Sequence, residues 1–154
     1  MRAAAQRAAR DKMRGVSRRR VLVLCTANSA RSQLAEGLIR HDFGDRVDVF
    51  SAGVAPSHVR PEAIAVMREI GIDISTHRSK HVSEFAGREF DDVITVCDAA
   101  NEQCPIFPGR ARRHHRDFKD PASVSGSEEQ QLAAFRQTRD ELRHWLTDIL
   151  AGPT

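Results

Sequence analysis

The chain has 154 residues and a mass of 17.2 kDa, which is enough for one domain and too little for a second. Hydrophobic residues make up 40% and charged residues 29%, a balance that excludes a disordered, collagen-like or disulfide-scaffold chain. The net charge is +3, but residues 1–20 hold eight basic side chains and one acid, so the other 134 residues carry −4. We therefore expect a basic, flexible extension over residues 1–20, an acidic domain over residues 21–150, and no nucleic-acid partner.

Apolar runs alternate with amphipathic stretches after the extension, which is typical of an α/β fold with a mainly parallel sheet. A buried strand is predicted over residues 21–25, and a helix follows almost at once over residues 32–43. Residues 46–50 alternate between apolar and polar side chains and predict a second strand.

The rest of the chain continues this alternation. A helix over residues 61–70 has a proline at its first position and Gly71 after its last. Strands follow over residues 92–97 and over residues 112–118, of which the second is rich in polar side chains. Ser127 forms a capping box with Gln130 for a closing helix, whose apolar stripe is Leu132, Phe135, Leu142, Trp145, Leu146 and Ile149. We expect a single domain with a four-stranded, mainly parallel sheet flanked by helices.

The cysteines and the apolar runs indicate the compartment. Residues 21–25 form the longest apolar run, which is far shorter than the ~18 residues that a membrane span needs and too short for a secretory core segment. Three cysteines, an odd number, do not form a disulfide framework in a chain of this size. We therefore expect a cytoplasmic protein without a membrane partner, whose reduced thiols serve chemistry or metal binding.

Cys25 ends the first predicted strand, and ligands of open parallel sheets collect beyond the carboxyl ends of the strands. The short loop before the helix can aim backbone N–H groups at an oxyanion, with support from the helix dipole, and Arg31 can grip two of its oxygens. The same positive field is expected to lower the pKa of the Cys25 thiol, and Ser32 to donate a hydrogen bond to the thiolate. The residues expected to bind the oxyanion are Thr26, Ala27, Asn28, Ser29, Ala30, Arg31 and Ser32.

The spacing of Cys25 and Arg31 recurs between Cys104 and Arg110. This second match has prolines that remove backbone donors from the loop, and no predicted strand leads into it. Only the first match combines a strand, a cysteine, a short loop, an arginine and an amphipathic helix. Cys25 is therefore the predicted nucleophile.

The chain resembles the thioredoxin-coupled arsenate reductases, which share the fold of the low-molecular-weight tyrosine phosphatases. The resemblance covers about residues 20–150 and rests on a combination of motifs. These are VLVLCTANSARSQLAEGLIR, SAG at 51–53, GIDIS at 71–75, HRSKHV at 77–82, VCDAANEQCPIFPG at 96–109 and KDPA at 119–122.

The resemblance implies that the protein reduces arsenate to arsenite for arsenic detoxification. Cys25 would attack arsenate, Asp120 would protonate the departing oxygen, and Asn28 would hold the shape of the loop. Cys97 would then attack Cys25 and release arsenite, and Cys104 would move the disulfide to Cys97–Cys104 for reduction by thioredoxin or a similar thiol protein. Phosphate and sulfate are expected to compete with arsenate, and a weak phosphatase side activity is expected.

The resemblance also suggests a potassium site, and the sequence departs from the family's usual residues at two positions. No cofactor is required, but some relatives bind potassium near the site, and similar positions are occupied here by Asn28, Glu36, Ser51 and Asp73. Ala27 stands where the family usually has glycine, which would cost roughly 1 kcal/mol if that residue needed a positive φ. His115 stands where a tryptophan is common, which leaves the packing near Asp120 open.

Two other functions remain open at this point. A low-molecular-weight protein tyrosine phosphatase would use Cys25, Arg31 and Asp120 alone. Against it, small side chains follow the Asp-Pro pair, the chain has no tyrosine, and the other two cysteines would have no role. A thiol-based metal or arsenite sensor would instead use soft ligands, although their spacing lacks a Cys-x2-Cys pair: Cys97, Cys104, His114 and His115.

Overall fold

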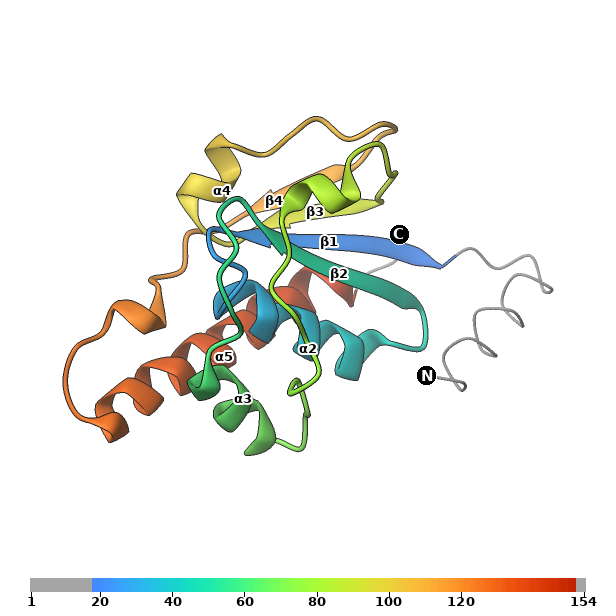
Figure 1. Ribbon diagram of the computed structural model, residues 1–154. Coiled ribbons are helices and arrows are strands. Elements are labelled where there is room, and N and C mark those ends of the chain that lie inside the picture. Colours follow the sequence, from blue (N-terminus) through green and yellow to red (C-terminus); the bar gives the residue numbers. More distant parts are fainter. Residues whose placement is uncertain (1–17, 152–154) are drawn as a thin grey trace.

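A four-stranded parallel sheet with the strand order β2-β1-β3-β4 lies at the centre of the protein (Figure 1). The computed structural model describes residues 18–151. The strands are β1 (Arg19–Cys25), β2 (Val47–Gly53), β3 (Asp92–Thr95) and β4 (Arg112–His115). Residues 21–24 of the inner strand β1 are fully buried, as expected for a strand that is covered on both faces. All three pairings are parallel, which confirms the predicted sheet.

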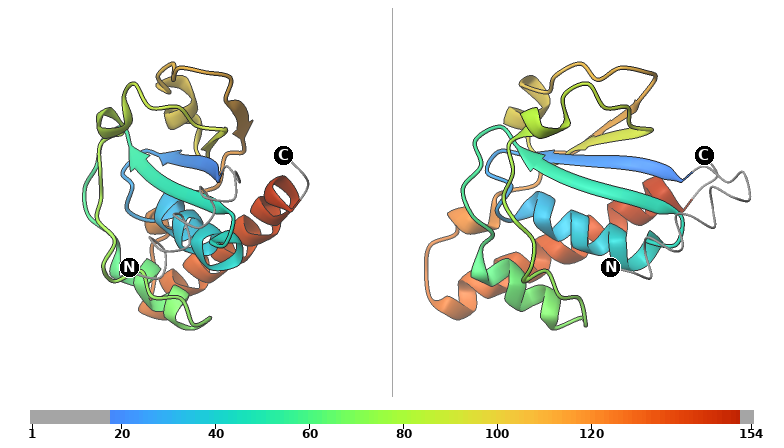
Figure 2. Two further views of the ribbon diagram at one scale, coloured as in Figure 1. Left: turned by 90° about the vertical axis from the view of Figure 1, so that its right-hand side faces the viewer. Right: turned by 45° about the vertical axis from the view of Figure 1, so that its right-hand side comes forward.

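The helices form a layer on each side of the sheet (Figures 1 and 2). One face is covered by α2 (Arg31–Phe43) and α5 (Glu128–Leu150), and α3 (Pro61–Arg68) packs against both of these helices. The other side carries the short helix α4 (Asp98–Glu102) and the 3-10 turn η1 (Val82–Phe85), and a second 3-10 turn, η2 (Pro121–Ser123), precedes α5.

The predicted capping box begins α5. Gln130 N–H donates to Ser127 Oγ at 3.1 Å, and Ser127 N–H donates to Gln130 Oε1 at 2.8 Å. The helix then buries Phe135, Leu142 and Leu146 of its predicted apolar stripe. The sequence therefore predicts both the start of this helix and the face that it buries.

Arg18 and Arg19 form ion pairs with the folded domain, so the ordered structure begins before the predicted first strand. β1 begins at Arg19, whose guanidinium forms a buried bidentate pair with Asp92 at 2.6 and 2.9 Å. Arg18 donates to Asp48 at 2.8 Å, to main-chain carbonyls of the turn before β2, and to the carbonyl of Val47 at the start of β2. The expectation that the domain begins at residue 21 is therefore wrong by three residues. The expected flexible extension otherwise lies outside the described residues.

Other element boundaries differ where neighbouring groups interrupt regular pairing. The strand predicted over residues 92–97 ends at Thr95, because Cys97 caps α4, a helix too short to show apolar periodicity. The strand predicted over 112–118 ends at His115, and the helix predicted over 61–70 ends at Arg68. The second strand is longer than predicted and runs on through the SAG motif to Gly53.

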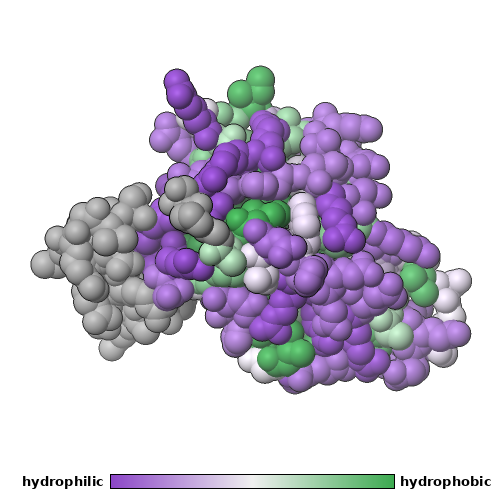
Figure 3. All heavy atoms as spheres, turned by 180° about the vertical axis from the view of Figure 1, so that it is seen from behind, coloured by the Kyte–Doolittle hydropathy of each residue, from purple (hydrophilic) through white to green (hydrophobic). Residues whose placement is uncertain are grey.

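The face shown in Figure 3 is largely hydrophilic, with small separate apolar patches. Within residues 18–151, no helix combines the length and the apolar character that crossing a bilayer requires.

The buried pair between Arg19 and Asp92 predicts how stability depends on pH. Burial opposes the charge of Asp92, but hydrogen bonds from Arg19 and His114 and the nearby charge of Arg112 bring its pKa below the usual 3.8. The unfolded chain therefore takes up this proton at a higher pH than the folded protein does. The carboxylate consequently stabilises the fold at neutral pH, and the contribution is lost as the pH falls through the lowered pKa.

We expect Asp92→Asn to lower the free energy of unfolding at neutral pH by about 3 kcal/mol, because it leaves a buried guanidinium without its charged partner. The deficit relative to the wild type should shrink as the pH falls below about 4, measured by urea unfolding across a pH series. Asp148→Asn, at a 70% exposed side chain, is the control and should change little. A deficit for Asp92→Asn that is the same at neutral and acid pH would contradict this assignment.

Candidate active site

The loop between β1 and α2 folds around the thiol of Cys25. The Cys25 side chain is 2% exposed, its Sγ lies 2.8 Å from Ser32 Oγ, and it accepts the Asn28 N–H at 3.2 Å. Arg31 is the first residue of α2, so the thiol, the loop amides and the helix N-terminus meet in one place. Of the predicted oxyanion-binding residues 26–32, Asn28 and Ser32 contact the sulfur directly.

Asn28 determines the shape of this loop. It is fully buried and has a φ of 49°, and among residues 18–151 it is the one non-glycine residue in the left-handed region. Asparagine tolerates this conformation better than most residues do. Its Nδ2 donates to Ser32 Oγ at 2.7 Å and to Ser51 Oγ at 2.9 Å, and its Oδ1 accepts the Lys80 N–H at 2.9 Å. Ala27 has no positive φ, so the strain considered for that position is absent.

Gly53, in the SAG motif at the end of β2, lets the strand approach the loop closely. A Cβ atom on Gly53 would lie 2.5 Å from Thr26 O and 2.8 Å from Asn28 N, which is closer than real side chains come. The residues after it bind the loop, since Val54 N–H donates to Cys25 O and Ala55 N–H donates to Thr26 O. Glycine is needed here because a backbone fills the space of a side chain.

The expected lowering of the Cys25 pKa is wrong in direction. Burial of the thiol raises its pKa and outweighs the lowering by the Ser32 hydrogen bond, the Arg31 charge and the Asn28 amide. The groups that favour the thiolate can be named from the sequence, but the desolvation that opposes it depends on how deeply the folded chain buries the sulfur. Burial therefore opposes ionisation of the Cys25 thiol, and Ser32, Arg31 and Asn28 favour it.

Arg31 joins the loop to the segment that carries Asp120. Its Nη1 donates to Phe118 O at 2.8 Å, two residues before Asp120. The Asp120 carboxylate caps η2 by accepting the Ala122 N–H at 2.9 Å, and the side chain is half-buried. Asp120 therefore holds the turn that its sequence predicts, and it lies on a segment fixed to the oxyanion loop.

His115 does not provide the aromatic packing near Asp120. Its Nδ1 lies 2.8 Å from Thr95 Oγ1 and its Nε2 lies 2.8 Å from Asp98 Oδ1, so the ring connects β3, β4 and α4. Phe118 instead packs on Trp145 of α5, with ring centroids 5.5 Å apart. α5 therefore supplies the aromatic ring that packs on Phe118, two residues before Asp120.

The other two thiols lie at the two ends of α4. Cys97 is the N-cap of α4, is buried, accepts the Ala100 N–H at 3.4 Å, and has its Sγ 3.3 Å from Thr26 Oγ1. Cys104 lies two residues beyond the helix, is half-buried, and accepts a hydrogen bond from Arg113 Nη1 at 3.0 Å. All three cysteines are free thiols. Through Thr26, the second thiol reaches the residue that follows Cys25.

The ligands suggested for a metal or arsenite sensor do not converge. His114 Nε2 lies 2.9 Å from Asp92 Oδ1, and both ring nitrogens of His115 have partners. Over the described part of the chain, no three His, Cys, Asp or Glu side chains gather as a metal site. The histidines instead connect strands to acidic side chains.

Three of the four positions suggested for potassium lie together, and the fourth does not join them. Glu36 is 5% exposed and accepts the Ser51 hydroxyl at 2.7 Å, and Ser51 in turn accepts from Asn28. Asp73 is exposed, and its carboxylate accepts the Ser75 N–H at 2.8 Å. Burial works against the charge of Glu36, but nearby cations and the Ser51 hydrogen bond bring its pKa below the usual value.

Residues 78–80 hold the oxyanion loop, a contact that the sequence did not predict. Gln33 Nε2 donates to both Asn28 O and Arg78 O at 3.0 Å, Ser79 Oγ donates to Ala27 O at 2.8 Å, and Lys80 N–H donates to Asn28. The HRSKHV motif contains Arg78, Ser79 and Lys80, and no local pattern there indicates contact with a loop about 50 residues earlier.

The sequence matches the family described as low molecular weight phosphotyrosine protein phosphatase over residues 20–152. An arsenate reductase from Bacillus licheniformis is 41% identical over 127 residues, which cover 82% of this chain and 91% of that protein.

Two solved structures are similar to the fold. One is an arsenate reductase in a phosphate-binding state, with a TM-score of 0.72 and 31% identity, covering 86% of this chain and 97% of the other. The second is a thioredoxin-dependent arsenate reductase from Corynebacterium glutamicum, with a TM-score of 0.66 and 25% identity, covering 97% of this chain and 71% of the other. With the family match over nearly the whole described chain, these likenesses show that the protein belongs to the low molecular weight phosphotyrosine protein phosphatase family and stands, within it, with the arsenate reductases.

Proposed function

We propose that this protein reduces arsenate to arsenite through a relay of Cys25, Cys97 and Cys104, and that a thioredoxin-type protein restores the thiols. The observation that carries the proposal is the placement of the second thiol. Cys97 Sγ contacts Thr26, next to the nucleophile, and Cys104 follows at the far end of a five-residue helix. A phosphatase needs neither thiol. The arsenate reductases that this chain is similar to support the same function.

The first step forms a bond between sulfur and arsenic. The Cys25 thiolate attacks arsenate held by the loop amides and by the guanidinium of Arg31, and an oxygen leaves as water after Asp120 donates a proton. Burial raises the pKa of the Cys25 thiol, and the Ser32 hydrogen bond, the Arg31 charge and the Asn28 amide oppose that rise. The segment holding Asp120 is positioned by the bond from Arg31 to Phe118.

The second step transfers two electrons to arsenic. The Cys97 thiolate attacks Cys25 Sγ, the bond between sulfur and arsenic breaks, and its electron pair stays on arsenic as As(V) becomes As(III). Two thiols are oxidised to the Cys25–Cys97 disulfide, which balances the reduction, and arsenite leaves. Phosphate and sulfate are not reduced by two thiols in this way. They would therefore bind in the loop only as competing oxyanions.

The third step moves the disulfide outward. Cys104 attacks Cys97 Sγ and frees Cys25. α4 separates Cys97 from Cys104, and its five residues alone span about 7.5 Å at the helical rise of ~1.5 Å. A disulfide needs Cα atoms roughly 4.4–6.8 Å apart, so α4 is expected to unwind. Its start is held by the bond from Asn101 N–H to Cys97 O at 3.1 Å. Pro105 follows directly and disfavours helical geometry at Cys104.

The reductant would approach from the side of Cys104. This thiol is half-buried while the other two are buried, and Ile106, two residues further on, has a side chain that is 94% exposed. A reducing cytosol suits three free thiols, and no nucleic-acid partner is part of the proposal. A weak phosphatase side activity follows from Cys25, Arg31 and Asp120 alone.

We expect arsenate-dependent oxidation of NADPH when the protein is supplied with thioredoxin and thioredoxin reductase. Cys104→Ser should stop after a single turnover, with Cys25 joined to Cys97, because no thiol remains to release the nucleophile. Peptide mass spectrometry after one equivalent of arsenate measures the pairing. Cys25→Ser is the control and should form no disulfide. Sustained thioredoxin-dependent turnover by Cys104→Ser would contradict the relay, and aryl phosphate hydrolysis without arsenate reduction would favour the phosphatase.

Asp120→Asn tests the proton donor through the phosphatase side activity. Without the proton, hydrolysis of aryl phosphates should slow most for basic leaving groups, by about 10²–10⁴-fold, and little for acidic ones. A series of aryl phosphates with leaving groups of graded pKa measures this dependence. Equal slowing across the series would mean that Asp120 serves only to cap η2.

A further inference from the structure

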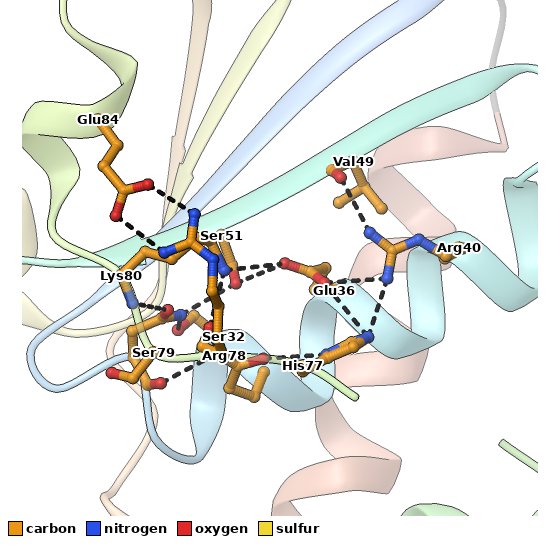
Figure 4. A network of polar contacts seen from close by, with 12 residues as sticks. Ser32, Glu36, Arg40, Val49, Ser51, His77, Arg78, Ser79, Lys80 and Glu84 are labelled. Carbon is orange, nitrogen blue, oxygen red and sulfur yellow. Dashed lines mark hydrogen bonds and ion pairs between the residues drawn. The ribbon is translucent and has the colours of Figure 1, made fainter. Parts of the chain in front are cut away.

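The buried carboxylate of Glu36, on the helix that follows the oxyanion loop, lies among the side chains of Arg40, Ser51, His77 and Lys80 (Figure 4). Glu36 Oε2 accepts from Arg40 Nη1 at 2.9 Å and lies 3.3 Å from His77 Nε2. Glu36 Oε1 accepts the Ser51 hydroxyl at 2.7 Å and lies 3.8 Å from Lys80 Nζ. Each oxygen of this carboxylate therefore already faces a hydrogen-bond donor and a positively charged or titratable nitrogen.

The direction of the hydrogen bond from Ser51 to Glu36 determines how Asn28 is oriented in the oxyanion loop. Because the Ser51 hydroxyl gives its proton to Glu36, Ser51 Oγ accepts from Asn28 Nδ2. The amide oxygen of Asn28 must then point the other way, where it accepts the Lys80 N–H. Glu36, Ser51 and Asn28 thus form one directed chain of hydrogen bonds that ends at the residue shaping the oxyanion loop.

Lys80 is fixed at three points around this chain. Its N–H binds Asn28 Oδ1, its carbonyl accepts the Gly53 N–H at 2.8 Å, and its ammonium faces Glu36 and donates to Arg78 O at 2.9 Å. The side chain is 11% exposed, against 51% for Arg40. Lys80 is therefore the more enclosed of these two cations, and its main chain is held independently of its side chain.

This arrangement does not fit the potassium ion considered from the sequence. A potassium site needs several oxygen lone pairs aimed at one point. Here the inner face of Asn28 presents an N–H₂ group, the Ser51 hydroxyl proton is committed to Glu36, and Asp73 caps its own turn. An added cation would also sit beside an ammonium and a guanidinium that already balance the one carboxylate.

We propose that Lys80 is a positioning residue for the oxyanion loop, supplying from within the chain the positive charge that holds Glu36, Ser51 and Asn28 in place. Oxyanion binding and turnover are then independent of potassium and dependent on the Lys80 ammonium. This inference rests on the proposed function for its oxyanion, and it assigns Lys80 no contact with the substrate.

The test compares Lys80→Met, Lys80→Arg and the wild type in the thioredoxin-coupled assay, with sodium exchanged for potassium at constant ionic strength. The wild type should show the same kcat and KM in both salts. Lys80→Met should raise the KM for arsenate and weaken phosphate binding by calorimetry, each about tenfold, as expected for the loss of one charge-assisted contact to a buried carboxylate. Lys80→Arg should restore most of both losses.

Two further variants separate positioning from general destabilisation. Arg68→Met is the control, because Arg68 is an exposed cation in the last turn of α3. It should leave KM unchanged. Glu36→Gln combined with Lys80→Met removes both charges and should cost less than Lys80→Met alone, since no buried carboxylate then lacks the cation beside its Oε1 atom.

The outcomes distinguish this inference from the proposed function. Potassium stimulation of the wild type, or an unchanged KM and phosphate affinity in folded Lys80→Met, would overturn the role of Lys80 while leaving arsenate reduction intact. A wild type that binds phosphate but does not reduce arsenate would overturn the proposed function, and the calorimetric arm would still decide whether Lys80 positions the loop.

Discussion

The site depends on one buried asparagine held in a left-handed conformation. At Asn28 the chain leaves β1, reverses and enters α2, and the side-chain amide satisfies Ser32, Ser51 and the main chain of Lys80. Each of these partners belongs to a different segment, so the loop, β2 and the segment before η1 are joined through one amide. A buried amide that lost one of these hydrogen bonds would lower the stability of the fold. We therefore expect the hydrogen bonds of Asn28 to form together.

Burial of the nucleophile opposes its ionisation. A thiol that is 2% exposed resists forming the thiolate, and burial raises its pKa despite Ser32, Arg31 and the Asn28 amide. The same burial excludes water from a reaction in which sulfur must attack arsenic and then be attacked by a second thiol. The relay proposed here also moves the oxidised bond away from this enclosed position, to Cys104 at the more exposed end of α4.

Local features were predictable, and long-range ones were not. The parts of the oxyanion site lie within 25 consecutive residues, from β1 through Cys25, the loop and Arg31 to α2. Their order along the chain predicts the site without knowledge of the overall fold. Roles for Cys97 and Asp120 needed the family resemblance, because only the sheet order brings their segments to the loop. Contacts from Lys80 to Asn28 join residues 52 apart. The sign of the Cys25 pKa shift depends on desolvation, which no short sequence window contains.

The central claim, that the hydrogen bonds of Asn28 hold the loop in the form that binds an oxyanion, is tested most directly by phosphate titration calorimetry on Asn28→Ala. The account predicts that phosphate binds at least about tenfold more weakly to the folded variant than to the wild type, as expected when one buried hydrogen-bonding amide is lost. Gln137→Ala, on the exposed face of α5, should bind phosphate as the wild type does. Unchanged phosphate affinity in folded Asn28→Ala would contradict the account.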